Sequence, residues 1–440
     1  MSYLLSAKEA RDQILAGTLT SEALVRSCLD RIDETDNTLH AWAYVDAEGA
    51  IEQARELDQI RRQGKPTGLL HGVPVGIKDI IDTKDMPTER GSPIFQDRRP
   101  KDDAELINCL KEAGAIILGK TVTTELAFLH PSETRNPHNI AYSPGGSSSG
   151  SAAAVAAYQV PLAIGTQTNG SVIRPASFCG VFATKPTSGV ISRTGVLRTS
   201  VTLDQVGGFG RSLEDLAILN DALATYDPRD INSYPYPKPH FHEGYAADPP
   251  VTPNLAWLDL PFSDRLSEEA TAAFKELKSV LSPIMETIPC PPAFAGLPDT
   301  LMTIHLYEFC QHQAETIETR WYDLSETIKP YIEKGRAISH SQYEEAIGTK
   351  TAASDFFDAF FKDFDAILCP SSTGAAPTFE KGTGDPCFST IWTLSGLPCL
   401  NLPLLSSLED MPMGVQLIGG REEDDRLMRT ARWLLNELTE

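Results

Sequence analysis

The hydrophobic period of the chain changes after residue 62, and this change constrains the fold more than any other feature. Residues 7–62 predict three helices, because their apolar residues recur three and four positions apart. Residues 71–82 form an almost continuous apolar run bounded by glycine and proline, which is typical of a buried strand. Helical and strand-like segments then alternate. The pattern predicts an α/β fold with a mixed, mainly parallel central sheet between helical layers.

The individual elements follow from the same periodicity. The predicted helices are 7–15, 21–32, 47–62, 103–113, 152–158, 174–179, 266–281, a helical stretch around 300–362, and 424–438. The predicted strands lie within 71–82 and at 115–118, 160–164, 254–257, 366–369 and 414–419. Residues 227–261 contain eight prolines, so we expect sparse regular structure there.

The charge and cysteine patterns exclude several classes of protein. The chain has 38 Lys and Arg against 60 Asp and Glu, a formal net charge of −22, which repels nucleic acids and anionic membrane surfaces. No stretch reaches the roughly 18 apolar residues of a membrane span, and the first residues lack the pattern of a signal peptide. The eight cysteines are scattered, with no CxxC pair and no cluster with histidine. We therefore expect a cytoplasmic protein with reduced thiols and no metal site.

Two familiar motif strings occur in contexts that do not suit them. Residues 114–121 fit GxxxxGK[ST], but a helix precedes them and the intervening residues are strand-like, unlike a phosphate-binding loop. Residues 146–150 fit GxSxG, which would make Ser148 the nucleophile of an α/β-hydrolase esterase. That nucleophile must directly follow a strand, whereas residues 137–144 are turn-like. An esterase that uses Ser148 stays an alternative.

Two hydroxyl-bearing turns flank a predicted strand. The tract Gly145-Gly-Ser-Ser-Ser-Gly150 runs straight into a small-residue helix, so it lies inside a folded unit and is not a linker between domains. Ser171 follows Ser147 by 24 residues and lies after the strand 160–164, just ahead of a short helix with Pro175 in its first turn. Because the ends of strands in α/β sheets gather functional groups, this pair of turns is the candidate site.

Several segments, taken in order, resemble the amidase signature family. The similar segments are Gly72-Val-Pro-Val-Gly-Ile-Lys78-Asp, Gly145-Gly-Ser-Ser-Ser-Gly-Ser151-Ala-Ala-Ala-Val, Gly165-Thr-Gln-Thr-Asn-Gly-Ser171-Val-Ile-Arg174-Pro-Ala, Cys179-Gly-Val-Phe-Ala-Thr-Lys185-Pro-Thr187 and Met413-Gly-Val-Gln-Leu-Ile-Gly419. The resemblance covers roughly residues 5–215 and 366–435, and several motifs in order are far more specific than any single string.

The resemblance implies a Ser-Ser-Lys triad. Ser171 would be the nucleophile, Ser147 the bridging serine held by a cis peptide, and Lys78 the base. The loop of Thr168, Asn169 and Gly170 resembles the family's oxyanion loop.

This sequence departs from many family members at three positions around the loop. Asn169 stands where glycine is commoner, and Gln167 where many members have aspartate. Arg174 lies three residues after the nucleophile instead of two, which leaves either a substrate carboxylate or backbone carbonyls as its partner.

The resemblance also implies the function and the organisation of the chain. We expect an amidohydrolase of linear amides that forms a serine acyl-enzyme, needs no cofactor, and has carbamate or ester hydrolysis as a side activity. An amidase component of an amidotransferase complex is the other alternative. The partner would be a small-molecule amide or carbamate, and homodimerisation is left open. We expect one domain, with N-terminal helices (1–62), a catalytic core (63–215), a variable substrate-shaping region (216–365), and closing strands and helix (366–440).

Overall fold

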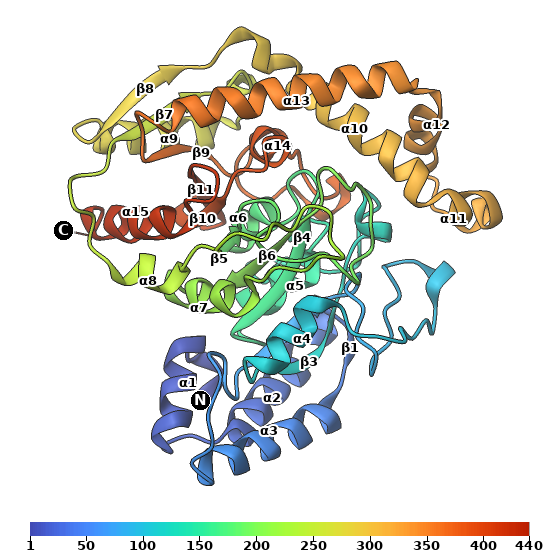
Figure 1. Cartoon of the computed structure of the whole chain (residues 1–440), viewed down its shortest axis with the longest axis vertical. Helices are drawn as coiled ribbons and strands as arrows, with labels where there is room; N and C mark the ends of the chain where they lie inside the picture. Colours follow the sequence, from blue (N-terminus) through green and yellow to red (C-terminus); the bar gives the residue numbers. More distant parts are fainter. Residues whose placement is uncertain (440) are drawn as a thin grey trace.

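A single mixed sheet runs through the structure, a computed structural model that describes residues 1–439 (Figure 1). The sheet has eleven strands within this range. In spatial order they are β1 (Trp42–Val45), β3 (Ile116–Thr121), β2 (Pro74–Lys78), β4 (Leu162–Gln167), β6 (Gln205–Gly210), β5 (Phe182–Lys185), β10 (Cys399–Ser406), β11 (Pro412–Ile418), β9 (Ala366–Pro370), β7 (Leu255–Asp259) and β8 (Met285–Pro289). Each of the four expected parts of the chain (1–62, 63–215, 216–365 and 366–440) contributes at least one strand to this sheet.

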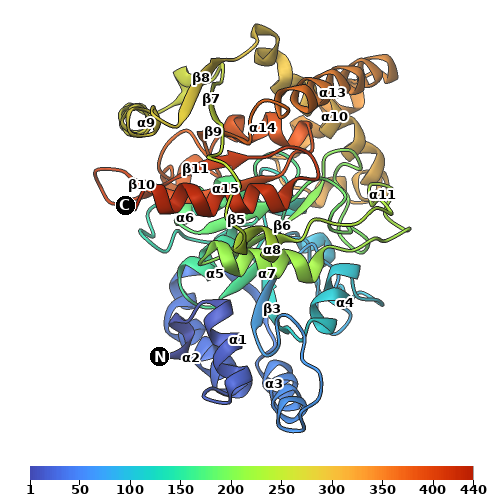
Figure 2. The same ribbon diagram turned by 60° about the vertical axis from the view of Figure 1, so that its left-hand side comes forward.

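Helices cover both faces of this sheet. They are α1 (Ala7–Ala16), α2 (Ser21–Leu39), α3 (Ala47–Arg62), α4 (Glu105–Glu112), α5 (Ser149–Ala156), α6 (Ile173–Cys179), α7 (Leu213–Leu223), α8 (Phe241–Ala246), α9 (Glu268–Leu281), α10 (Leu297–His312), α11 (Ala314–Thr319), α12 (Lys329–Ala337), α13 (His340–Phe360), α14 (Cys387–Leu394) and α15 (Asp424–Glu437). Figure 2 shows α15, α7 and α8 across the front of the sheet, while α1–α3 gather at one end of the molecule. No described helix is both long enough and apolar enough to span a bilayer.

The two-sided burial explains the apolar runs seen in the sequence. In β4, Leu162 and Ile164 pack into the cluster that includes residues of α4, α7 and α15. Ala163 points to the opposite face and packs with residues of α2, α3, α5 and α6. Because successive strand residues alternate between faces, both faces must be apolar for the strand to be buried.

The expected fold class, a mixed sheet between helical layers, is confirmed, but parallel pairing does not predominate. Within residues 1–439, four strand pairs are parallel and six are antiparallel. Five of the six antiparallel pairs involve β1, β5, β6 or β10, strands that the sequence pattern did not predict. The strands it did predict are mostly those separated by helices, and such connections favour parallel pairing.

Other differences concern boundaries and the proline-rich segment. The predicted helix 21–32 continues to Leu39, and the predicted strand 71–82 is regular only over Pro74–Lys78. Residues 227–261 contain α8 and β7, with little other regular structure. The GxxxxGK[ST] string forms β3, whose Lys120 donates to the carbonyl of Ile81 at 2.7 Å.

The topology brings two of the candidate segments to one edge of the sheet. β2 and β4 are parallel neighbours, so their carboxyl ends lie side by side. Lys78 is the last residue of β2, and Gln167 is the last residue of β4, just before the loop that leads to Ser171. α5 begins at Ser149, directly after the Gly/Ser turn, and packs against both strands. The fold therefore positions a lysine and two serine-bearing turns together.

Candidate active site

Lys78 is completely buried at the end of β2 and is held by hydroxyl groups. Its Nζ donates to Ser147 Oγ at 2.8 Å, to Thr166 Oγ1 at 2.8 Å and to the Thr166 carbonyl at 3.4 Å. Thr166 belongs to the neighbouring strand β4, so the strand pairing itself fixes the amine. The three acceptors are neutral, and an amine among neutral acceptors in the interior is far easier to deprotonate than one paired with a carboxylate.

The surroundings of Lys78 favour its neutral form. Among residues 1–439, no carboxylate lies within ion-pair distance of its Nζ. Burial lowers its pKa well below the usual value of 10.5, and the negative charge of Asp204 opposes this shift. Asp79, the next residue, pairs instead with Lys120, whose Nζ is 3.5 Å away. The ion pair between Lys78 and Asp79 that their adjacency suggests is therefore not formed.

Ser147 lies in the turn before α5, and its peptide bond with Gly146 is cis, as the resemblance implied. Its carbonyl accepts from the backbone N–H of Thr124 at 3.2 Å. The neighbouring Ser148 is also buried, but its hydroxyl donates to the Thr166 carbonyl at 3.2 Å and accepts from the Thr166 N–H at 3.3 Å. Ser148 thus ties α5 to β4, and none of its recorded partners is a histidine, so the geometry does not favour the esterase alternative.

Gln167 organises the turn that carries Ser171. Its Oε1 accepts from the backbone N–H groups of Val172 at 2.8 Å and Ile173 at 3.0 Å, at the start of α6. Its Nε2 donates to Thr393 Oγ1 at 2.9 Å. The Gln167 side chain forms no hydrogen bond with Arg174. The main effect of a glutamine at position 167 is therefore not that Arg174 loses an acidic partner. Gln167 caps the helix that begins two residues after Ser171.

The loop before Ser171 is fixed from the outside and keeps its backbone donors free. The Asn169 side chain accepts from Thr390 at 2.7 Å, and its carbonyl accepts from Thr393 at 2.5 Å, both on α14. Neither Asn169 nor Gly170 has a positive φ, so asparagine replaces glycine without strain. In the described range no protein acceptor binds the backbone N–H groups of residues 169–171. Such free, fixed donors can stabilise a developing oxyanion.

A small cavity lies beside this loop. Its volume is about 40 Å³. It is lined by Ala127, Phe128, Leu129, Thr168, Asn169, Gly170, Ser171, Arg174, Met302, His305 and Pro386. All of the predicted oxyanion and substrate-binding residues therefore meet at one cavity together with Ser171. Met302 and His305 come from α10, within the segment expected to shape the substrate site.

One nitrogen of the Arg174 guanidinium holds the backbone, and the other two have no partner in the described part of the chain. Its Nη2 donates to the Gly146 carbonyl at 2.6 Å, which joins α6 to the turn of Ser147. Its Nε and Nη1 are buried and have no hydrogen-bond partner. Burial lowers its pKa to about 10, so the guanidinium stays charged at neutral pH. A buried cation with two unpaired donors at a cavity suits a negatively charged ligand group.

Two further groups at the site were not predicted from the sequence. His305 is 5% exposed, its Nε2 is buried without a partner, and burial lowers its pKa to about 4, so it is neutral near pH 7. Asp204 accepts from Thr168 Oγ1 at 2.6 Å and from the backbone of Thr199 and Ser200. An esterase that used Ser148 would also need a histidine, and His305 is only one of several histidines that follow Ser148 in the sequence. Asp204 gives no signal in the sequence, because only the tertiary fold brings it to the loop.

One of the two hydrogen bonds expected within the triad is not formed among the residues that the structure describes. No hydrogen bond between the Ser147 and Ser171 hydroxyls occurs in the part of the chain that is described, whereas Lys78 and Ser147 are in direct contact. Catalytic hydrogen bonds are often long in unliganded enzymes and shorten when substrate binds. The arrangement offers a neutral base, a bridging hydroxyl, a partly exposed serine and free backbone donors, the parts that acyl transfer requires.

Comparison with known proteins establishes the class to which this fold and site belong. The family model described as Amidase matches residues 23–428. The chain therefore belongs to the amidase signature family, whose members are C–N hydrolases. It is 32% identical to the A subunit of glutamyl-tRNA(Gln) amidotransferase from Trichormus variabilis, over 97% of this chain and 96% of the relative. It is also 32% identical to the corresponding protein of Acidothermus cellulolyticus, over 96% of this chain and 92% of the relative.

Solved structures agree with this assignment. The chain superposes with a TM-score of 0.92 and 27% identity on a structure described as an unexpected vestigial protein complex that reveals the evolutionary origins of an s-triazine catabolic enzyme; 98% of each chain is covered. Native peptide amidase from Stenotrophomonas maltophilia superposes with a TM-score of 0.83 and 27% identity, over 98% of this chain and 96% of that one.

Proposed function

We propose that the chain hydrolyses a carboxamide or a related C–N acyl bond through an acyl-enzyme on Ser171. The observation that carries the proposal is the 2.8 Å hydrogen bond from the buried Lys78 amine to Ser147, close to a cavity that Ser171 lines. A serine hydroxyl attacks an amide only if a neighbouring base takes its proton. A neutral lysine can take that proton through a second hydroxyl.

The proton transfers follow from the order of these groups. Ser171 Oγ bonds to the acyl carbon while its proton passes to Ser147 Oγ, and the Ser147 proton passes to Lys78 Nζ. The relay then reverses and protonates the leaving nitrogen, so the C–N bond breaks and an ester remains on Ser171. Water attacks this ester by the same relay and releases the acid. The backbone N–H groups of residues 169–171, which have no protein acceptor among residues 1–439, would stabilise the charge on the acyl oxygen in both steps.

The cavity favours a small acyl group. Its volume of about 40 Å³ is far below the roughly 300–1,000 Å³ of sites for drug-sized ligands, so a long acyl chain does not fit without movement. Arg174 offers two unpaired donors there, which supports a second carboxylate on the acyl part, as in a dicarboxylic half-amide. Linear amides are the expected substrates, and carbamates or esters would react through the same intermediate.

A second candidate function is the amidase component of an amidotransferase complex, which would deliver ammonia to a partner. The relatives named as amidotransferase subunits support this candidate more directly than stand-alone hydrolysis, because they match almost the whole chain. The superposable protein described within a complex also supports a partner protein. Both candidates share the Ser171 half-reaction. Homodimerisation and a cytoplasmic location stay predictions.

A turnover panel on the purified chain tests both candidates. The substrates are small aliphatic amides, aryl amides, dicarboxylic half-amides, glutamine and carbamates, and mass spectrometry follows the acyl group on Ser171. Hydrolysis with no partner present would contradict a strict need for a second protein. Ammonia release from glutamine that appears only after a partner from the native host is added would contradict stand-alone function. Turnover that persists in Ser171→Ala would contradict the acyl-enzyme itself.

A further inference from the structure

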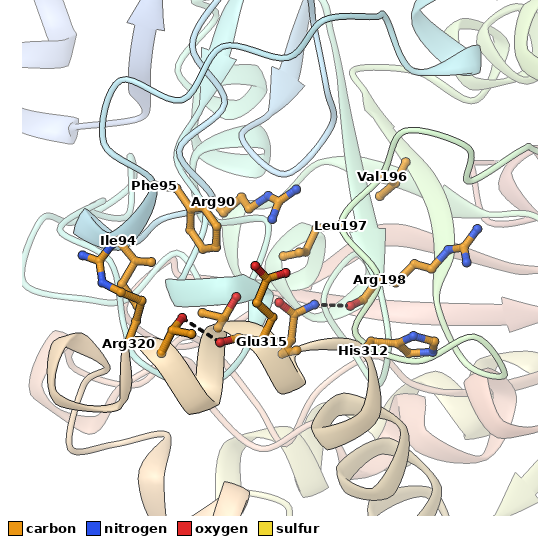
Figure 3. Close-up of a pocket in the computed structure, with 12 residues that line it drawn as sticks. Arg90, Ile94, Phe95, Val196, Leu197, Arg198, His312, Glu315 and Arg320 are labelled. Atoms are coloured by element: carbon orange, nitrogen blue, oxygen red, sulfur yellow. Dashed lines mark hydrogen bonds between the residues drawn. The ribbon is translucent and has the colours of Figure 1, made fainter.

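A second, larger cavity lies apart from the Ser171 cavity (Figure 3). Its volume is about 550 Å³, within the range of small-molecule sites. Three segments line it: residues 90–95 after β2, residues 196–198 after β5, and residues 312–320 at the junction of α10 and α11. None of its lining residues belongs to the Ser171 cavity. An occupant would therefore not depend on the catalytic residues.

The lining of this cavity is more positive than the chain as a whole. Arg90, Arg198 and Arg320 are among the lining residues, against one carboxylate from Glu315. Figure 3 shows the Arg90 guanidinium turned into the space, whereas those of Arg198 and Arg320 point away from it. Arg320 is neutralised in part, because its Nε lies 2.7 Å from the Asp323 carboxylate. In the described residues, Arg90 and Arg198 form no ion pair. In a chain with a net charge of −22, the unpaired Arg90 at this cavity is a local site for an anion.

Arg90 is the central group of this site. Its guanidinium carbon lies 4.7 Å from the centre of the Phe95 ring, and its buried Nε has no partner. The nearby Asp82 carboxylate is already held by both terminal nitrogens of Arg98, at 2.7 and 2.8 Å. Burial lowers the pKa of Arg90 to about 10, so it remains a cation near neutral pH. A mostly desolvated cation without its own carboxylate is costly, and a bound anion would offset that cost.

The remaining walls are apolar and fixed in place. Figure 3 shows Phe95, Leu197 and Glu315 turned toward the same space as Arg90. Ile94 and Val196 extend this apolar lining. Gln313 Nε2 donates to the Arg198 carbonyl at 2.7 Å, which ties the end of α10 to the loop on the opposite wall. The site therefore combines one cation with a hydrophobic surface in a preformed cavity.

We propose that this cavity binds a small organic carboxylate with an apolar body. The carboxylate would pair with Arg90, and the apolar body would lie on Phe95 and Leu197. Glu315 opposes the anion and sets an upper limit on its affinity.

Binding of 4-fluorobenzoate to the full chain, followed by fluorine NMR, tests the proposal. We expect saturable binding of 4-fluorobenzoate and weaker binding of 4-fluorobenzyl alcohol, which lacks the charge. Inorganic phosphate, which lacks the apolar body, should displace 4-fluorobenzoate only weakly. Arg90→Met should weaken binding about tenfold, whereas Glu315→Gln should strengthen it about threefold. Arg198→Met removes a guanidinium that points away from the space, so it should change binding little. Arg99→Met removes an exposed arginine of the same segment that does not line the cavity, so it should change nothing.

Two outcomes would overturn the proposal. The first is an absence of saturable 4-fluorobenzoate binding to the native chain. The second is binding that Arg174→Met abolishes while the Arg90 and Glu315 variants leave it unchanged, which would place the probe at the Ser171 cavity. Glu315 is exposed, so Glu315→Gln keeps the test decisive even if Arg90→Met fails to fold.

Discussion

Lys78 Nζ and Ser147 Oγ lie 2.8 Å apart, and the amine reaches this contact from the end of a strand that is buried on both faces. The hydrogen bond joins two segments that are 69 residues apart in the sequence. Burial makes the ammonium form costly, while the hydroxyls of Ser147 and Thr166 satisfy the neutral amine. The contact therefore couples the protonation state of Lys78 to the hydroxyl that would carry its proton.

We expect kcat/KM to rise with pH through the folded-state pKa of Lys78. Only the neutral amine accepts a proton, and burial lowers this pKa, so the rise should lie well below the usual lysine value of 10.5. The negative charge of Asp204 raises the pKa, so Asp204→Asn should move the acid limb to lower pH. Lys78→Met should cost at least about a hundredfold in kcat/KM. A Lys78→Met profile that keeps the acid limb of the native enzyme would assign the ionisation to another group.

The stability of Lys78→Met is a second, independent readout. A lysine whose pKa is lowered on folding binds its proton more tightly in the unfolded chain, so it destabilises the fold below the unfolded pKa near 10.5. We therefore expect Lys78→Met to raise the free energy of unfolding by about 1 kcal/mol at pH 7, with the gain shrinking as the pH approaches 10. Chemical denaturation at pH 7, 8.5 and 10 measures this trend. A gain that is constant over this range would contradict a perturbed lysine.

The sequence predicted the elements whose periodicity is unambiguous, and it missed strands whose composition hides them. β6 is Gln205-Val-Gly-Gly-Phe-Gly210, and three glycines erase the usual strand signal. Gly207 is needed because a Cβ there would lie 2.5 Å from the Thr184 carbonyl of the paired strand β5. β10 contains Pro403 beside a shift in register between Leu402 and Leu405, and proline normally argues against a strand.

The residues of the candidate site also fall into two groups, those that the sequence identified and those that it missed. Lys78, Ser147 and Ser171 stand in motifs, so the resemblance to the family identifies them from the sequence alone. Thr166 lies in one of these motifs, but its contact with Lys78 comes from the pairing of β4 with β2. His305 stands in no motif, because only the packing of α10 against the core brings it to the cavity. The apolar pattern also predicts a strand that continues beyond Lys78, whereas β2 ends there. Ile80 and Ile81 are as apolar as a strand requires, yet their N–H groups turn back onto the Lys78 carbonyl.

A fluorophosphonate probe should label Ser171 and leave Ser148 unmodified. Ser171 is partly exposed at the cavity, whereas Ser148 is buried and its hydroxyl is bonded to the backbone of Thr166. Peptide mapping by mass spectrometry should find the label on the peptide that contains residue 171. Ser171→Ala should abolish labelling, while Ser148→Ala, the matched control, should retain it in the folded protein. Recovery of the label on Ser148 would revive the esterase alternative.

Arg174→Met should separate acidic from neutral substrates. The guanidinium has two buried donors without partners at the cavity, and a substrate carboxylate would satisfy them. We expect KM for dicarboxylic half-amides to rise about tenfold or more, with a smaller change for neutral amides of similar size. Because Nη2 also bonds the Gly146 carbonyl, Arg174→Lys serves as a second variant that keeps the charge. An equal rise for both substrate types would show that the arginine only holds the turn of Ser147.

The last prediction concerns Gln167, whose side chain accepts from the N–H groups of Val172 and Ile173 directly after the nucleophile. Gln167→Leu has a similar volume but leaves both buried donors unpaired, at about 1–3 kcal/mol each. We expect the free energy of unfolding to fall by about 2–4 kcal/mol and kcat to fall more than KM changes, because the turn that aims Ser171 loosens. Gln167→Glu keeps both acceptors beside a helix N-terminus and should retain most of the activity, although it loses the donor to Thr393. Gln63→Leu, at an exposed helix end, controls for the loss of an amide. If Gln167→Leu matched the native protein in both unfolding and kcat, the cap would not be what holds the nucleophile in place.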